Sequence, residues 1–91
     1  MNQAMSVESK LVALLDAAES LDIEVRQADL GGQGGGLCSI RGRRVLFVDL
    51  ATDKATQYDG ALRDIAQLPE IDMIYLRPEI REDIDRARRR C

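Results

Sequence analysis

The sequence feature that most constrains the fold is a glycine-rich run between two segments with strand character. Its six residues contain five of the seven glycines in the chain: Gly31, Gly32, Gln33, Gly34, Gly35 and Gly36. Each glycine costs roughly 0.5–1 kcal/mol relative to alanine wherever the backbone must be ordered. The run is therefore either unordered, or ordered in a backbone geometry that alanine could not adopt.

Hydrophobic periodicity predicts the secondary structure on either side of this run. Helices are expected over residues 7–20 and 53–68, and a third is expected to begin at Pro78. Strands are expected over four segments, namely residues 23–28, 37–41, 44–50 and 73–76. Between the second and third strands, Arg41-Gly42-Arg43 predicts a tight hairpin turn.

The element order αβββαβα predicts an α+β fold with a small mixed sheet of about four strands. Three consecutive strands joined by short connections favour an antiparallel β-meander. The fourth strand follows a helix, so we expect it to pair in parallel with the third strand through a right-handed crossover. We expect the helices to cover mainly one face of the sheet, and the 91 residues to form a single domain.

The strand over residues 44–50 carries apolar side chains on both faces. Val45 and Phe47 point one way, and Leu46 and Val48 point the other, which is typical of a central strand with both faces covered. Three helices would not easily cover both faces of a four-stranded sheet. We therefore expect a second copy of the protein to cover one face in a homodimer; the alternative is that the first helix folds over it.

The composition excludes several classes of function. The chain has no histidine, which excludes histidine-based acid–base catalysis and histidine-ligated metal sites. It has no tryptophan, one Phe, two Tyr and a formal net charge of -3, which argues against a nucleic-acid partner. No apolar stretch is long enough to span a membrane, and no signal-peptide pattern is found at the start. We therefore expect a cytoplasmic protein without membrane association, cofactor or metal.

The glycine-rich run allows two interpretations. Consecutive backbone N–H groups in a turn can form an anion-binding concavity, and Arg41, Arg43 and Arg44 are candidate charged neighbours. However, a strand follows instead of a helix, and the run matches neither G-x-x-x-x-G-K-[ST] nor G-x-G-x-x-G. We expect a mobile or bulged connection in a hairpin, with a loop that binds a small ligand or anion as the alternative.

Two further residues near the run are candidates for chemistry. Residues 45–49 resemble a Walker B strand, but any buried strand that ends in an acid gives this pattern. We expect Asp49 to close a central strand, to cap the next turn or to pair with a nearby arginine. Cys38 is a candidate thiol, but without a neighbouring histidine or a C-x-x-C motif we expect it to be buried. Cys38 and Cys91 alone make no disulfide framework.

Several segments carry a family resemblance: residues 23–26, the glycine run with Leu37 and Cys38, Gly42, residues 45–49 and residues 74–79. They look like a group of small bacterial proteins of unknown function, over about residues 23–85. This resemblance implies a shared fold and no activity. A second, topological resemblance is to the hairpin and helix of a zinc metallopeptidase of the phage-repressor-cleaving type, whose helix carries H-E-x-x-H. The corresponding residues 55–62 contain no histidine and no glutamate, so this resemblance implies no zinc chemistry.

These expectations favour a non-enzymatic protein-interaction or regulatory domain that forms a homodimer. The alternative is a module that binds a small ligand or anion at residues 31–36.

Overall fold

The computed structural model describes residues 4–89, which form an α+β fold. The elements in chain order are α1 (Val7–Ser20), β1 (Glu24–Ala28), β2 (Gly36–Ile40), β3 (Arg43–Asp49), α2 (Lys54–Ala66), the 3-10 helix η1 (Pro69–Met73) and α3 (Pro78–Arg89). The three predicted α-helices are confirmed. Side-chain caps define where two of them begin, since Ser6 accepts the N–H of Ser9 at α1 and Asp53 accepts that of Thr56 at α2.

The sheet has the strand order β1-β3-β2, so β3 lies in its centre as predicted. β1 runs parallel to β3 and β2 runs antiparallel to it, with Glu24 and Cys38 on either side of Val45. The predicted mixed sheet is thus confirmed, but the β-meander is wrong. β1 pairs with β3 instead of β2, because the loop between β1 and β2 crosses the end of β3.

The predicted fourth strand over residues 73–76 is not formed, and the sheet within residues 4–89 has three strands. The chain forms η1 here and then a segment without regular structure up to Pro78. Parallel pairing with β3 is unavailable to this segment, since β1 already occupies that side of β3. Met73 and Tyr75 are consequently 83% and 82% exposed instead of packed in a sheet.

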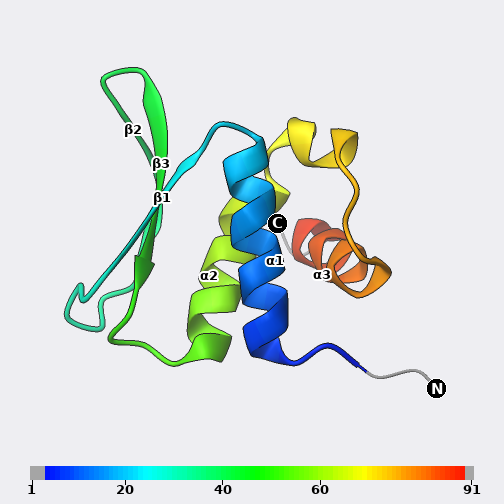
Figure 1. The fold of residues 1–91 in the computed structure, drawn as a ribbon, viewed down its shortest axis with the longest axis horizontal. Helices are drawn as coiled ribbons and strands as arrows, with labels where there is room; N and C mark the ends of the chain where they lie inside the picture. The colour runs from blue at the N-terminus through cyan, green and yellow to red at the C-terminus, as the bar shows by residue number, and fades with distance from the viewer. Residues whose placement is uncertain (1–3, 90–91) are drawn as a thin grey trace.

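The elements form three layers: the sheet, then α1 and α2, then η1 and α3 (Figure 1). α1 and α2 cover one face of the sheet, called the inner face here, and α3 packs against α2. The other face, called the outer face, has no helix over it within the part of the chain that the structure describes. α1 therefore does not fold over the second face of the sheet.

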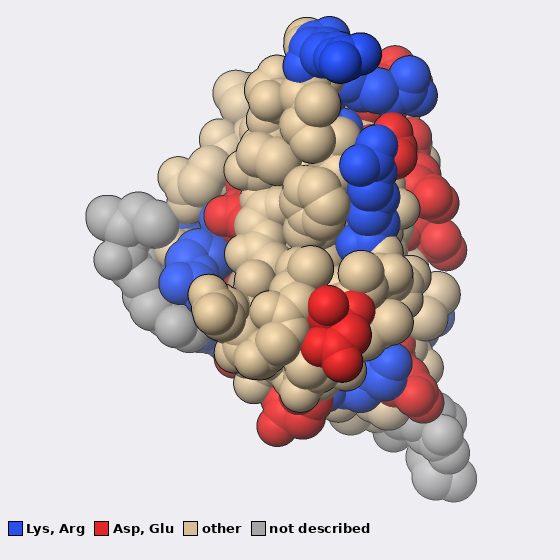
Figure 2. Space-filling view, turned by 90° about the vertical axis from the view of Figure 1, so that its left-hand side faces the viewer, with Lys and Arg blue, Asp and Glu red and all other residues tan. Residues whose placement is uncertain are grey.

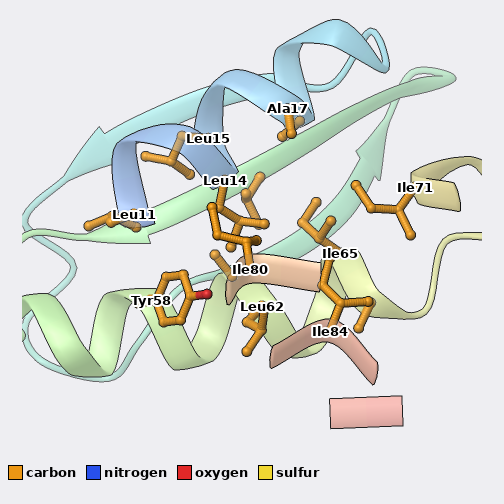
Figure 3. Close-up of a cluster of buried hydrophobic side chains, with 14 of the residues drawn as sticks. Leu11, Leu14, Leu15, Ala17, Tyr58, Leu62, Ile65, Ile71, Ile80 and Ile84 are labelled. Carbon is orange, nitrogen blue, oxygen red and sulfur yellow. The ribbon is translucent and has the colours of Figure 1, made fainter. Parts of the chain in front are cut away.

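The hydrophobic core lies between the inner face of the sheet and the helices. Figure 3 shows Leu14 of α1, Tyr58 and Leu62 of α2 and Ile80 of α3 converging there. Leu46 and Val48 of β3 belong to the same hydrophobic cluster and contribute to it from the sheet. Full burial of one such aliphatic side chain contributes about 1.5–3 kcal/mol, so this cluster holds the three layers together. None of the described helices is long and apolar enough to cross a membrane.

A polar cluster at Asp83 ties the three helices together beside this core. Its Oδ2 accepts hydrogen bonds from Nζ of Lys10 at 3.0 Å and from the hydroxyl of Tyr58 at 2.8 Å, and its Oδ1 pairs with Arg86. Burial disfavours the charged carboxylate, but the hydrogen bonds from Lys10 and Tyr58 outweigh this effect and lower the pKa of Asp83. The same environment, through desolvation first and then Asp83, raises the pKa of Tyr58.

We expect Asp83→Asn to reduce the free energy of unfolding by about 1–3 kcal/mol near neutral pH, because it weakens hydrogen bonds to a charged group. The lowered pKa means that the carboxylate stabilises the native state fully above its unfolded pKa of about 3.9. This contribution is lost as the pH falls through the lower native pKa, so the difference between variant and parent should shrink in acid. Urea unfolding at neutral and acidic pH measures this difference in the free energy of unfolding. Asp85→Asn, on an exposed position of the same helix, is the control, and equal losses in both variants would contradict the prediction.

Candidate functional site

The glycine loop (residues 31–36) is ordered around the carboxylate of Asp49, the last residue of β3. Asp49 is 2% exposed. Its Oδ1 accepts the backbone N–H groups of Leu30 and Ala51, each at 2.9 Å, and its Oδ2 accepts that of Gly34 at 2.8 Å. Two of the roles expected for Asp49 are met: it is the last residue of the central strand, and it accepts a hydrogen bond from the backbone N–H of Ala51 in the following turn.

The electrostatics of Asp49 follow from these donors. Burial disfavours its charged form, but the surrounding backbone N–H groups, led by those of Leu30 and Gly34, outweigh this effect and lower the pKa of the carboxyl. The loop amides thus converge on an anion, as an anion-binding loop would, but the anion belongs to the chain itself. An external phosphate would have to compete with Asp49 for the same donors.

Two glycines explain why alanine could not build this loop. Gly34 has a φ of +88°, a left-handed conformation that directs its N–H to Asp49. A Cβ at Gly35 would lie 1.8 Å from the carbonyl oxygen of Phe47. The glycines therefore let the loop approach the backbone of β3, and the connection is neither a hairpin between neighbouring strands nor an unordered segment.

The three candidate arginines are not brought to the glycine loop. Arg44 donates to Glu70 and to the carbonyl oxygen of Leu21, both at 2.7 Å. Arg43 pairs with Glu24 at 3.5 Å, and Arg41 lies in the hairpin turn with a φ of +54°. Arg43 and Arg44 begin β3 and Arg41 precedes it in the turn, whereas the glycine loop lies at the other end of β3, and seven extended residues span about 20 Å. The three arginines are therefore close to the glycine loop in the sequence but far from it in the structure.

Cys38 is exposed, so the expectation that it is buried is wrong. It lies on β2 opposite Val45, and both residues face away from the helices. The inner face of β2 and β3 is instead defined by Leu37 and Leu46, which belong to or pack against the core. Cys38 is therefore exposed because it lies on the face of the sheet that no described helix covers.

The outer face of the sheet carries an uncharged band with charged residues along its margins (Figure 2). Val45 is only 1% exposed although it lies on this face. Its cross-strand neighbour Glu24 is bridged to Arg26 and Arg43, and Arg26 lies over the ring of Phe47 with 5.8 Å between Cζ and the ring centroid. Long ion-paired side chains thus cover part of the apolar surface for which the sequence favours a second layer.

A cavity of about 390 Å³, which was not expected from the sequence, lies between the glycine loop, the end of β3 and α2. Gln57, Gly60 and Asp64 of α2 line it. The available signal was a glycine in the middle of a helix, which helix propensity does not explain; Gln57 gave no signal, because glutamine is a good helix former. Within residues 4–89 no group of His, Cys, Asp and Glu side chains could hold a metal ion.

Comparisons with protein-family models, with curated proteins and with solved structures found no match for this chain. The resemblance to small bacterial proteins and the topological resemblance to a metallopeptidase both stay predictions.

Asp49→Asn is expected to loosen the glycine loop, because an amide N–H group replaces an oxygen that accepts backbone N–H groups. Hydrogen exchange at Leu30 and Gly34 should accelerate by roughly tenfold or more, and the melting temperature should fall. Asp29→Asn is the matched control, since exposed Asp29 accepts only the N–H of Gly31 in this loop. Unchanged exchange at Leu30 and Gly34 would contradict the role given to Asp49.

Gly35→Ala is expected to destabilise the protein by about 3 kcal/mol or more, because its Cβ would overlap the backbone of β3. The neighbouring Gly36→Ala should change stability by less than about 1 kcal/mol, since its Cβ would only touch Asp64 at 3.8 Å. Urea unfolding of both variants measures the difference. Similar stabilities for the two variants would disprove the close approach at Gly35.

Proposed function

We propose that this protein is a non-enzymatic, cytoplasmic interaction domain that pairs with a second copy through the outer face of its sheet. The observation that carries the proposal is the uncharged band on that face, over which no described helix lies. Ile40 is 40% exposed, Cys38 is exposed and Phe47 is half-buried on this band. Burial of such apolar area against a second sheet would contribute about 25 cal/mol per Å².

The distribution of charge supports a second copy as the partner. Arg41 and Arg43 lie where β2 turns into β3, and Asp29 lies at the opposite end of the sheet, directly after β1. A two-fold axis that lies between the two sheets and perpendicular to their strands would place the arginines of one copy against Asp29 of the other. Face-to-face packing of two sheets about 10 Å apart is the usual way to bury such a surface.

Packing through the face is favoured over pairing through the free edge of β2. The backbone N–H of Leu37 points to that edge, where it donates to Oδ2 of Asp64 at 3.1 Å. A strand from another chain would have to displace this bond before it could pair there. Asp64 therefore protects the edge, as charged side chains often do at the edges of natural sheets.

Several features favour interaction over catalysis. The chain has no histidine, and both oxygens of the buried Asp49 carboxylate already accept backbone N–H groups. The exposed thiol of Cys38 lies near Val45 and Ile40 on the outer face. In the proposed dimer it would contact the partner and would not be open to a substrate.

We expect the protein to sediment as a dimer at micromolar concentrations and Ile40→Arg to sediment as a monomer, because a charge would then lie in the apolar interface. Ile40 is partly exposed, so the substitution should leave the fold intact. Tyr75→Arg is the matched control: this exposed residue lies outside the sheet, and its variant should remain dimeric. Analytical ultracentrifugation over a concentration series measures the association. A parent protein that stays monomeric, or loss of the dimer only in Tyr75→Arg, would overturn the proposal.

The thiol of Cys38 gives an independent readout. In a Cys91→Ser background, its rate of reaction with a thiol reagent should fall as protein concentration rises and the outer face becomes covered. A rate that does not depend on concentration while dimers are present would exclude this face as the interface.

A further inference from the structure

The cavity between the glycine loop, the end of β3 and α2 has the size of a small-molecule site, at about 390 Å³. Gln57, Gly60 and Asp64 line it from one side of α2, since residues spaced by three and four positions share a helix face. A Cβ at Gly60 would meet no atom within 4 Å. Glycine at this position therefore leaves the space open at the middle of the helix.

Gln57 supplies the observation that points to a ligand. The residue is 7% exposed, and its Oε1 is the one buried side-chain polar atom without a hydrogen-bond partner within residues 4–89. Nε2 donates to the carbonyl oxygen of Thr52 at 2.7 Å, which fixes the orientation of the amide. Exchanging the two amide atoms would set two acceptor oxygens against each other. Buried polar atoms normally have a hydrogen-bond partner, and the described residues supply no donor to Oε1.

The charges around the cavity favour a cationic donor. Two carboxylates, those of Asp49 and Asp64, line it, against the single guanidinium group of Arg63. The lining amide of Gly34 already donates to Asp49, so an anionic ligand would have to displace this bond to use it. An ammonium group carries three N–H donors and one positive charge, and it fits both requirements.

We propose that this cavity binds a small molecule through a primary ammonium group, which donates to Oε1 of Gln57 and whose charge Asp64 balances. A simple amine and an amino acid share this group. An amino acid would in addition place its carboxylate near Arg63. The inference does not rest on the proposed pairing of two copies, because Gln57 and Asp64, which would hold the ammonium group, both belong to α2 and not to the outer face of the sheet.

Titrations with three probes test the chemical class of the ligand: propylamine, alanine and propionate, each added to the isotopically labelled protein up to millimolar concentrations. We expect propylamine and alanine to shift the backbone resonances of residues 34–37 and the side-chain amide resonances of Gln57. A stronger response to alanine would identify an amino acid as the ligand, and an equal response would identify a simple amine. The absence of any shift, or an equal response to propionate, would overturn the proposal and leave a bound water as the partner of Oε1.

Variants test the role of Gln57 itself. Gln57→Leu removes the acceptor at similar size and should weaken propylamine binding by roughly tenfold or more. Gly60→Leu fills the cavity with a better helix former, so it should fold and lose binding even if Gln57→Leu fails to fold. Gln27→Leu makes the same replacement at an exposed position of β1 and should bind like the parent. Parental affinity in either Gln57→Leu or Gly60→Leu would overturn the proposal. Ile40→Arg should bind propylamine normally, which separates this site from the dimer interface.

Discussion

The carboxylate of Asp49 is the point on which the arrangement of the sheet depends. It ends the central strand and accepts backbone N–H groups from Leu30 and Gly34, which belong to the segment that carries the chain from β1 to β2. That segment crosses the end of β3, where its N–H groups would otherwise lack partners. A charged acceptor at this place therefore makes the β1-β3-β2 order possible.

This strand order explains the two features on which the proposals rest, the cavity beside α2 and the outer face of the sheet. Because β2 lies at one edge of the sheet next to α2, the glycine loop and α2 enclose a cavity there. Because α1, α2 and α3 all lie on one side of the sheet, the outer face keeps its uncharged band. Ion pairs of Glu24 with Arg26 and Arg43 cover part of this band without removing it.

The glycines and Gln57 illustrate two ways in which a sequence departs from the best local choice. At Gly35 the departure serves the fold, since any side chain would meet the backbone of β3. At Gly60 the fold gains nothing, since glycine weakens a helix; at Gln57 it gains one hydrogen bond to Thr52 but buries an unpartnered oxygen. Departures with no structural benefit are the ones that most often mark a binding site.

The sequence by itself determined the three helices, the hairpin turn at Arg41 and the central place of β3, because these depend on local periodicity, caps and turn residues. It also excluded histidine chemistry outright. Only the tertiary structure decided that β1 pairs with β3, that residues 73–76 form no strand, that Cys38 is exposed and that Gln57 lines a cavity. Periodicity states which side of a strand is apolar but not which strand lies beside it. The partner of Asp49 is a loop 15 to 19 residues away in sequence, and only folding brings the two together.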